Sequence, residues 1–153
     1  MSDQKETADS QTSDELKFQL RLTLSDHYSG LIQRQQEDGE LTRLKNTLSN
    51  HRAEMVCQYD AFSDYCAESE VRGEINTALY RWTKDTINDQ SKKAKYLKIF
   101  TIYVGGESVY GSEIADRLER DLQPLASRRI IETISRYDND PTSNPQPPKK
   151  YLS

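Results

Sequence analysis

The chain has 153 residues and a formal net charge of −4, with 34% hydrophobic and 30% charged residues. This length fits one domain that can bury a core without a disulfide or a metal ion, and the acidic balance argues against general nucleic-acid binding. No apolar run approaches the roughly 18 residues of a membrane span, and the polar start MSDQKETADSQTSDE lacks the apolar centre of a signal peptide. These features predict a cytoplasmic protein with no membrane segment.

The two ends of the chain differ in composition from the middle. Residues 1–13 hold almost no apolar side chains, which predicts a disordered tail. Residues 139–153 predict a flexible tail because they are rich in proline, containing Pro141, Pro145, Pro147 and Pro148. A ligand for a proline-reading partner is one alternative for this segment, but a solvated tail is the simpler interpretation. A single domain is expected over residues 14–138.

The domain begins with a pattern typical of a half-buried strand. Apolar residues alternate strictly with polar ones, and they are Leu16, Phe18, Leu20, Leu22 and Leu24. Steps of two residues place these side chains on one face of a strand, whereas on a helix they would scatter around the circumference. We therefore expect a strand here, although leucine is not a favoured strand residue.

Residues 40–67 predict a long amphipathic helix. The apolar residues at the first and fourth heptad positions are Leu41, Leu44, Leu48, Met55, Phe62 and Tyr65. Two polar residues, His51 and Gln58, interrupt this stripe. A second helix is expected over 70–89, and its apolar stripe consists of Val71, Ile75, Ala78, Leu79 and Trp82. The two helices are expected to form an antiparallel hairpin.

The second half of the domain predicts a β-α-β unit. The segment YLKIFTIYV, residues 96–104, is apolar on both faces, as expected of a central strand. A helix follows from Ser112. The segment RRIIETISRY, residues 128–137, fits a helix by its spacing, but its isoleucines and threonine favour a strand that would complete the unit. Together the elements predict an α+β fold, in which a small two- or three-stranded sheet packs against the long helical hairpin between disordered termini.

The loop between this central strand and the next helix is rich in glycine. Gly106, four further residues, Gly111 and Ser112 match part of a phosphate-binding P-loop. However, no lysine precedes the serine, and Glu107 adds a negative charge where phosphates would lie. A weaker anion site at the helix start is one alternative, formed by Gly105, Gly106, Gly111 and Ser112. The simpler interpretation is a turn, since glycine tolerates positive φ angles.

The succession of strand, short loop, helix and strand, about 40 residues long, resembles the opening unit of thioredoxin-like domains, including the KaiB group. No Cys-x-x-Cys sequence accompanies it here. The resemblance therefore implies a β-α-β unit and no particular activity.

No set of reactive side chains has the spacing of a catalytic or metal site. His27 and His51 are the only histidines. Neither stands three or four residues from Cys57 or Cys66, as metal ligands on one helix would. The lysines at 92–98 are a minor candidate for contacts with phosphates. We therefore predict no catalytic residues, no metal and no cofactor.

The apolar stripe on residues 40–67 leads to the functional hypothesis, a non-catalytic interaction or regulatory protein. The expected contact residues are Leu41, Leu44, Leu48, Met55 and Phe62. Their partner would be another protein or a second copy of the chain, and nucleic acid is disfavoured. The alternative is a small protein or enzyme that binds a phosphate or nucleotide ligand at loop 105–114.

Overall fold

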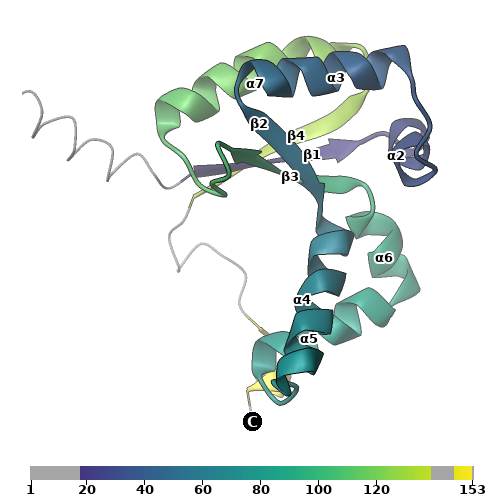
Figure 1. Cartoon of the computed structure of the whole chain (residues 1–153), viewed down its shortest axis with the longest axis vertical. Coiled ribbons are helices and arrows are strands. Elements are labelled where there is room, and N and C mark those ends of the chain that lie inside the picture. The colour runs from purple at the N-terminus through teal and green to yellow at the C-terminus, as the bar shows by residue number, and fades with distance from the viewer. Residues whose placement is uncertain (1–17, 139–146, 153) are drawn as a thin grey trace, which may run out of the picture.

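A computed structural model describes residues 18–138 and 147–152 (Figure 1). Within these ranges the elements in chain order are β1 (Phe18–Leu24), α2 (Asp26–Gln33), α3 (Gly39–Asn50), β2 (Ala53–Cys57), α4 (Gln58–Arg72), α5 (Ala78–Asn88), α6 (Gln90–Tyr96), β3 (Ile99–Val104), α7 (Ser112–Ser127), β4 (Ile131–Asp138) and the 3-10 turn η1 (Lys149–Tyr151). The α+β class is confirmed. The predicted disordered tail at 1–13 lies outside the described residues.

The four strands form one antiparallel sheet in the order β2-β3-β1-β4. Strands β3 and β4 are parallel to each other, are joined by α7, and have β1 between them. This is the split β-α-β arrangement found in ferredoxin-like folds. The predicted strands in 15–24, 96–104 and 128–137 are confirmed as β1, β3 and β4. The sheet has four strands because β2 joins it, which the sequence did not predict.

The hydrophobic core lies between the sheet and the pair α3 and α7, which pack together on one face of it (Figure 1). The alternation in β1 has the predicted effect, since Leu20, Leu22 and Leu24 are completely buried on this face. Their partners from the helices and the other strands include Leu44, Leu48, Phe100, Ile102, Ala115, Leu118, Leu122, Leu125, Ile130 and Ile131. Each fully buried leucine or isoleucine contributes about 1.5–3 kcal/mol relative to an exposed one.

The long helix predicted over 40–67 is wrong. Helix α3 ends at Asn50, Arg52 adopts a left-handed φ of 55°, and the chain continues as β2. Strand β2 pairs with β3 from Ala53 to Cys57, so its backbone groups find partners in the neighbouring strand. The heptad pattern was misleading because its leucines belong to α3, whereas Met55 reaches the same core from a strand.

The predicted long helical hairpin is also absent, because its first helix is divided into α3, β2 and α4, and only the shorter helices α4 and α5 pack together. Gly73, with a left-handed φ of 73°, ends α4, and α5 starts after the capping residue Thr77. Helices α4, α5 and α6 form an insertion of residues 58–96 between β2 and β3, on the side of the sheet away from α3 and α7 (Figure 1). We call this segment the insertion. Val71 is 88% exposed and Ile75 48% exposed, so the predicted apolar stripe is not buried as a whole.

The described end of the chain, residues 147–152, packs against α5. Tyr151 is buried, its hydroxyl donates a hydrogen bond to the Asp85 carboxylate at 2.5 Å, and Arg81 donates to its carbonyl oxygen. The prediction placed these residues in a flexible tail, but Tyr151 gains apolar burial and hydrogen bonds that a tail would lack. None of the described helices is long and apolar enough to cross a membrane.

Candidate ligand-binding cleft

A cleft of about 530 Å³ lies between the insertion and the face of the sheet that α3 and α7 leave uncovered. We call this sheet surface the open face. From the sheet and the loop beside it, the lining residues are Gln19, Arg21, Val109, Tyr137 and Asp138. From the insertion they are Gln58, Phe62, Leu79, Trp82, Thr83, Thr86, Lys92 and Tyr96.

The local structure of each element explains why these side chains meet. In β1 the alternation that buries the leucines turns Gln19 and Arg21 to the open face. In α5, Trp82 and Thr86 are four residues apart and share one face of the helix. In α6 the same spacing aligns the lining residues Lys92 and Tyr96. Strand periodicity on one wall and helical periodicity on the other therefore produce the cleft.

The Arg21 guanidinium is held in place by uncharged neighbours. It lies over the Tyr137 ring, 4.1 Å from the ring centre, and its Nε donates to the Gln19 side-chain oxygen at 2.8 Å. The Gln58 amide oxygen, when it faces the guanidinium, accepts from Nε at 3.1 Å and from Nη1 at 3.2 Å. The hydrogen-bond network favours this orientation of the amide. Arginine is thus pre-positioned, with N–H groups left over for another acceptor.

The charge of the cleft comes from Arg21 and Lys92, and one carboxylate, that of Asp138, also belongs to the lining. Within 18–138 and 147–152, no carboxylate forms an ion pair with Arg21 or Lys92. Some cations elsewhere do have carboxylate partners: Arg136, for example, pairs with Asp116 at 2.7 Å and with Glu119 at 3.0 Å. A half-buried guanidinium without a counter-ion favours an anionic ligand, and the partly enclosed site strengthens that attraction.

Aromatic rings form much of the insertion wall. Phe62 from α4 and Tyr96 from α6 meet edge to face, with ring centres 5.1 Å apart. Trp82, the single tryptophan of the chain, lines the cleft from α5 and is only partly buried. The insertion therefore gives the cleft an aromatic wall, whereas the sheet wall carries the Arg21 guanidinium and the Asp138 carboxylate.

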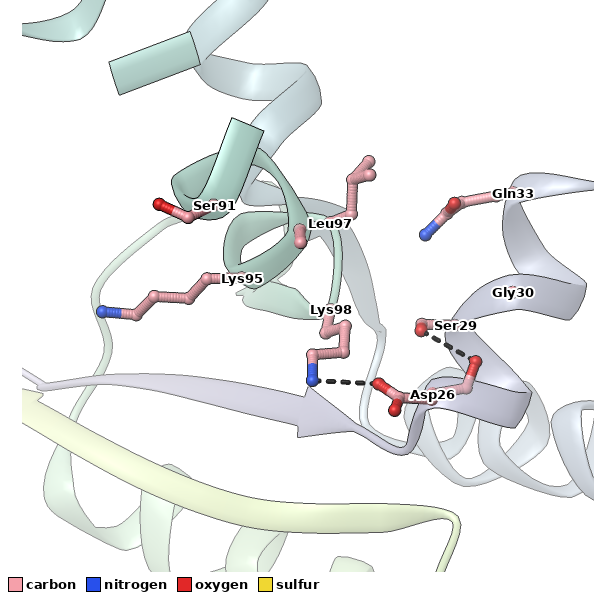
Figure 2. A pocket seen from close by; sticks show the side chains of 9 residues that line it. Asp26, Ser29, Gly30, Gln33, Ser91, Lys95, Leu97 and Lys98 are labelled. Atoms are coloured by element: carbon pink, nitrogen blue, oxygen red, sulfur yellow. Dashed lines mark hydrogen bonds and ion pairs between the residues drawn. The ribbon is translucent and has the colours of Figure 1, made fainter. Parts of the chain in front are cut away.

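A second hollow, of about 590 Å³, lies between α2 and α6 and is shown in Figure 2. Its lining includes no aromatic ring. The Lys98 ammonium is paired with Asp26 at 2.9 Å, and Figure 2 shows Lys95 pointing away from this pair. The hollow is slightly larger, but Lys98 and Asp26 neutralise each other in it and no ring lines it, so we place the candidate site in the cleft beside Arg21.

The residues predicted to bind a partner are divided by the structure. Leu41, Leu44 and Leu48 are at most 2% exposed and pack inside the subunit, and Met55 packs against the same core. Phe62 alone lines the cleft. The leucine stripe is consequently not a surface that a partner can contact in the folded subunit.

The predicted anion loop forms a tight turn and a helix start. Gly105 and Gly106 have φ angles of 58° and 83°, and Val104 and Glu107 exchange two backbone hydrogen bonds of 2.9 Å. Gly111 is the residue that caps α7, and Ser112 is the first residue of that helix. None of the four predicted residues lines either of the two clefts described above.

The sequence placed Trp82 only in a helix stripe and Lys92 only among the lysines at 92–98, the minor candidate for phosphate contacts, and it assigned no site to Arg21 or Tyr137. For Arg21 the available signal was the alternation in β1, which indicated that this side chain faces away from the core. Nothing local indicates that a helical insertion lies opposite that face. The cleft therefore depends on contacts between segments far apart in the chain.

The described residues contain no group of three or more His, Cys, Asp and Glu side chains placed to hold a metal ion. His51 instead contacts Asp121, with 2.8 Å between Nε2 and the carboxylate oxygen. Burial raises the pKa of both thiols, Cys57 and Cys66, which keeps them protonated and weakly nucleophilic at neutral pH.

Comparisons of the chain with protein-family models, with curated proteins and with solved structures find no match. The residues of the cleft are therefore the basis for inferring function.

Proposed function

We propose that this protein is a non-catalytic ligand-binding protein, and that the cleft between the open face and the insertion binds a small anionic molecule. The observation that supports this proposal most strongly is the Arg21 guanidinium, which is half-buried, fixed by Tyr137 and Gln19, and without a carboxylate partner among the described residues. A volume of about 530 Å³ falls in the range of small-molecule sites.

The polar groups of the cleft favour an anion over a neutral ligand. The Gln19 amide is used twice, since its oxygen accepts from Arg21 and its nitrogen donates to the Ser108 carbonyl. The hydroxyls of Thr83 and Thr86 donate to backbone carbonyls in their own helix. The donors that remain belong mainly to Arg21 and Lys92, and such donors make strong charge-assisted hydrogen bonds to phosphate or carboxylate.

The connection of the insertion to the sheet supports a regulatory role. Both ends of the insertion join neighbouring strands, at Cys57 of β2 and at the start of β3. A ligand that contacts Arg21 and Lys92 would link the sheet to the insertion and would stabilise the folded chain by mass action. The effect of ligand binding on the sheet is in this way passed to the insertion, and from there to any molecule that contacts the insertion.

The first test is thermal denaturation in the presence of inorganic phosphate and a panel of small carboxylates, at matched ionic strength. At least one anion should raise the melting temperature of the native chain, and Arg21→Gln should abolish this rise. Arg120→Gln is the matched control, because this arginine on α7 is 72% exposed and lies outside the cleft lining. A panel without any shift, or a shift that persists in Arg21→Gln, contradicts the proposal.

A second candidate function is self-association through the insertion, which is favoured by apolar side chains that the fold leaves exposed. Val71, Ile75 and Leu79 are 88%, 48% and 47% exposed near the turn between α4 and α5. This candidate retains the interaction hypothesis but moves the contact away from the leucine stripe. Sedimentation velocity should show a dimer that Val71→Lys dissociates, and a chain that stays monomeric at high concentration excludes it.

A further inference from the structure

We infer that the ligand of the cleft carries a planar ring as well as an anionic group, so that the ring stacks on the insertion while the anion binds Arg21. This inference rests on the function proposed above and adds the chemical class of the ligand. A nucleoside monophosphate and an aromatic carboxylate share this chemistry, and the experiment below distinguishes them.

The rings of the aromatic wall lie outside the buried residues of the insertion, although Phe62 and Tyr96 also pack against each other. The buried residues between α4 and α5 are a different set, Cys66, Ser69, Tyr80, Thr83 and Thr86. Phe62, Trp82 and Tyr96 come from three different helices, and all three remain partly exposed where they line the cleft. Rings that converge on a cavity and are left uncovered provide a stacking surface for another planar group.

The two walls carry complementary chemistry. Arg21 belongs to the sheet wall, and its planar guanidinium is backed on one side by the Tyr137 ring. Lys92 lies one helical turn before Tyr96, so a second cation stands beside the aromatic wall. A ligand that is only anionic would leave the aromatic rings exposed to water. A ligand that is only aromatic would leave Arg21 without a counter-ion. A ligand with both groups satisfies both walls.

The single tryptophan makes the inference directly measurable, because Trp82 is the only source of tryptophan fluorescence in the native chain. The probes are adenosine monophosphate, uridine monophosphate, adenosine, inorganic phosphate, indole-3-acetate and acetate, each titrated at constant ionic strength. We expect the ring-bearing anions to quench or shift Trp82 emission and to bind about tenfold or more tightly than their separate halves. If the nucleotides bind more tightly than indole-3-acetate, the anionic group of the ligand is a phosphate. If the order is reversed, that group is a carboxylate.

Two variants, measured by isothermal titration calorimetry, separate stacking from charge. Trp82→Leu should weaken the best ring-bearing anion about tenfold while leaving inorganic phosphate or acetate unchanged. Phe62→Leu should also weaken binding of the ring-bearing anion, and it replaces Trp82→Leu as the test variant if Trp82→Leu does not fold. Tyr59→Leu is the control, because this ring on α4 does not line the cleft.

The outcomes distinguish this inference from the proposal on which it rests. Anions that bind through Arg21 with no gain from a ring would overturn the inference and leave the proposed function intact. Equal affinity of native chain and Trp82→Leu for the ring-bearing ligand would overturn it as well. No binding of any probe or of the simple anions would overturn both.

Discussion

The Arg21 guanidinium lies 4.1 Å from the centre of the Tyr137 ring, on the open face of the sheet. The two residues belong to the neighbouring strands β1 and β4 and are diagonal to each other, because Tyr137 pairs directly with Gln19. The contact fixes a long, flexible side chain on the sheet wall of the cleft. It therefore connects the stability of the sheet with the proposed binding of an anion.

This contact predicts different effects for two substitutions of Tyr137. Tyr137→Leu removes the ring and should cost about 0.5–1 kcal/mol of unfolding free energy, the usual value of a cation–π contact near the surface. Anion affinity should fall as well, since Arg21 loses its fixed position. Tyr137→Phe keeps the ring and should preserve both quantities in urea unfolding and anion titration. Identical behaviour of the Leu and Phe variants would show that the stacking is immaterial.

The leucine stripe of α3 predicts a stability defect and no binding defect. Leu44→Ala should lower the free energy of unfolding by about 2–5 kcal/mol, because Leu44 is completely buried in the core. Leu79→Ala, at a site 47% exposed, should change it by only about 0.5 kcal/mol. Chemical denaturation of both variants checks this. If Leu44→Ala kept native stability and lost only self-association, the stripe would be a partner surface as the sequence suggested.

The turn after β3 predicts a difference between two glycines. Gly106 has a φ of 83° and open space around it, so Gly106→Ala should cost about 1–2 kcal/mol through backbone strain alone. Gly39, at the start of α3, also has open space but no positive φ, and Gly39→Ala should be neutral or slightly stabilising. Melting temperatures of the pair provide the measurement. A neutral Gly106→Ala would mean that the turn does not require glycine.

Tyr110 predicts a loss of stability at alkaline pH. Its buried hydroxyl accepts from the Leu20 N–H at 2.7 Å and donates to the Ile102 carbonyl at 3.0 Å, and burial raises the pKa of Tyr110 to about 12. The unfolded chain loses this proton near pH 10, before the folded chain does. The stability that Tyr110 gains from its raised pKa is therefore fully present below about pH 10 and is lost as the pH rises toward 12. Two pKa units correspond to about 3 kcal/mol.

The variant that isolates this effect is Tyr110→Phe. At neutral pH it should lose about 1–3 kcal/mol, because a buried N–H and a buried carbonyl are left unpaired. Above about pH 10 its stability should fall less steeply with pH than that of the native chain. Urea unfolding at a series of pH values compares the two slopes. Parallel slopes would show that Tyr110 titrates alike in the folded and unfolded chains.

Residues 53–57 show where prediction from the sequence fails. The segment AEMVC continued an apparent helical stripe, and no local signal separates it from α3. It becomes β2 because the edge of β3 offers a full row of backbone partners, and that edge lies more than 40 residues further along the chain. The candidate cleft could not be predicted for the same reason, because Arg21 and Trp82 line one cavity but belong to segments far apart in the sequence.

Local patterns are enough to predict the strands with the strongest periodicity, and with β1 the core face of the sheet. Alternation decides which side chains of β1 avoid water, and the apolar run of β3 predicts a central strand, although only Phe100 and Ile102, on one of its faces, are buried. Contacts in the folded chain are needed to show that the stripe of α3 packs inside the core and that an aromatic insertion lies opposite Arg21. The physical reason is that sheet edges and cleft walls are completed by hydrogen bonds and contacts between distant segments, which local patterns do not encode.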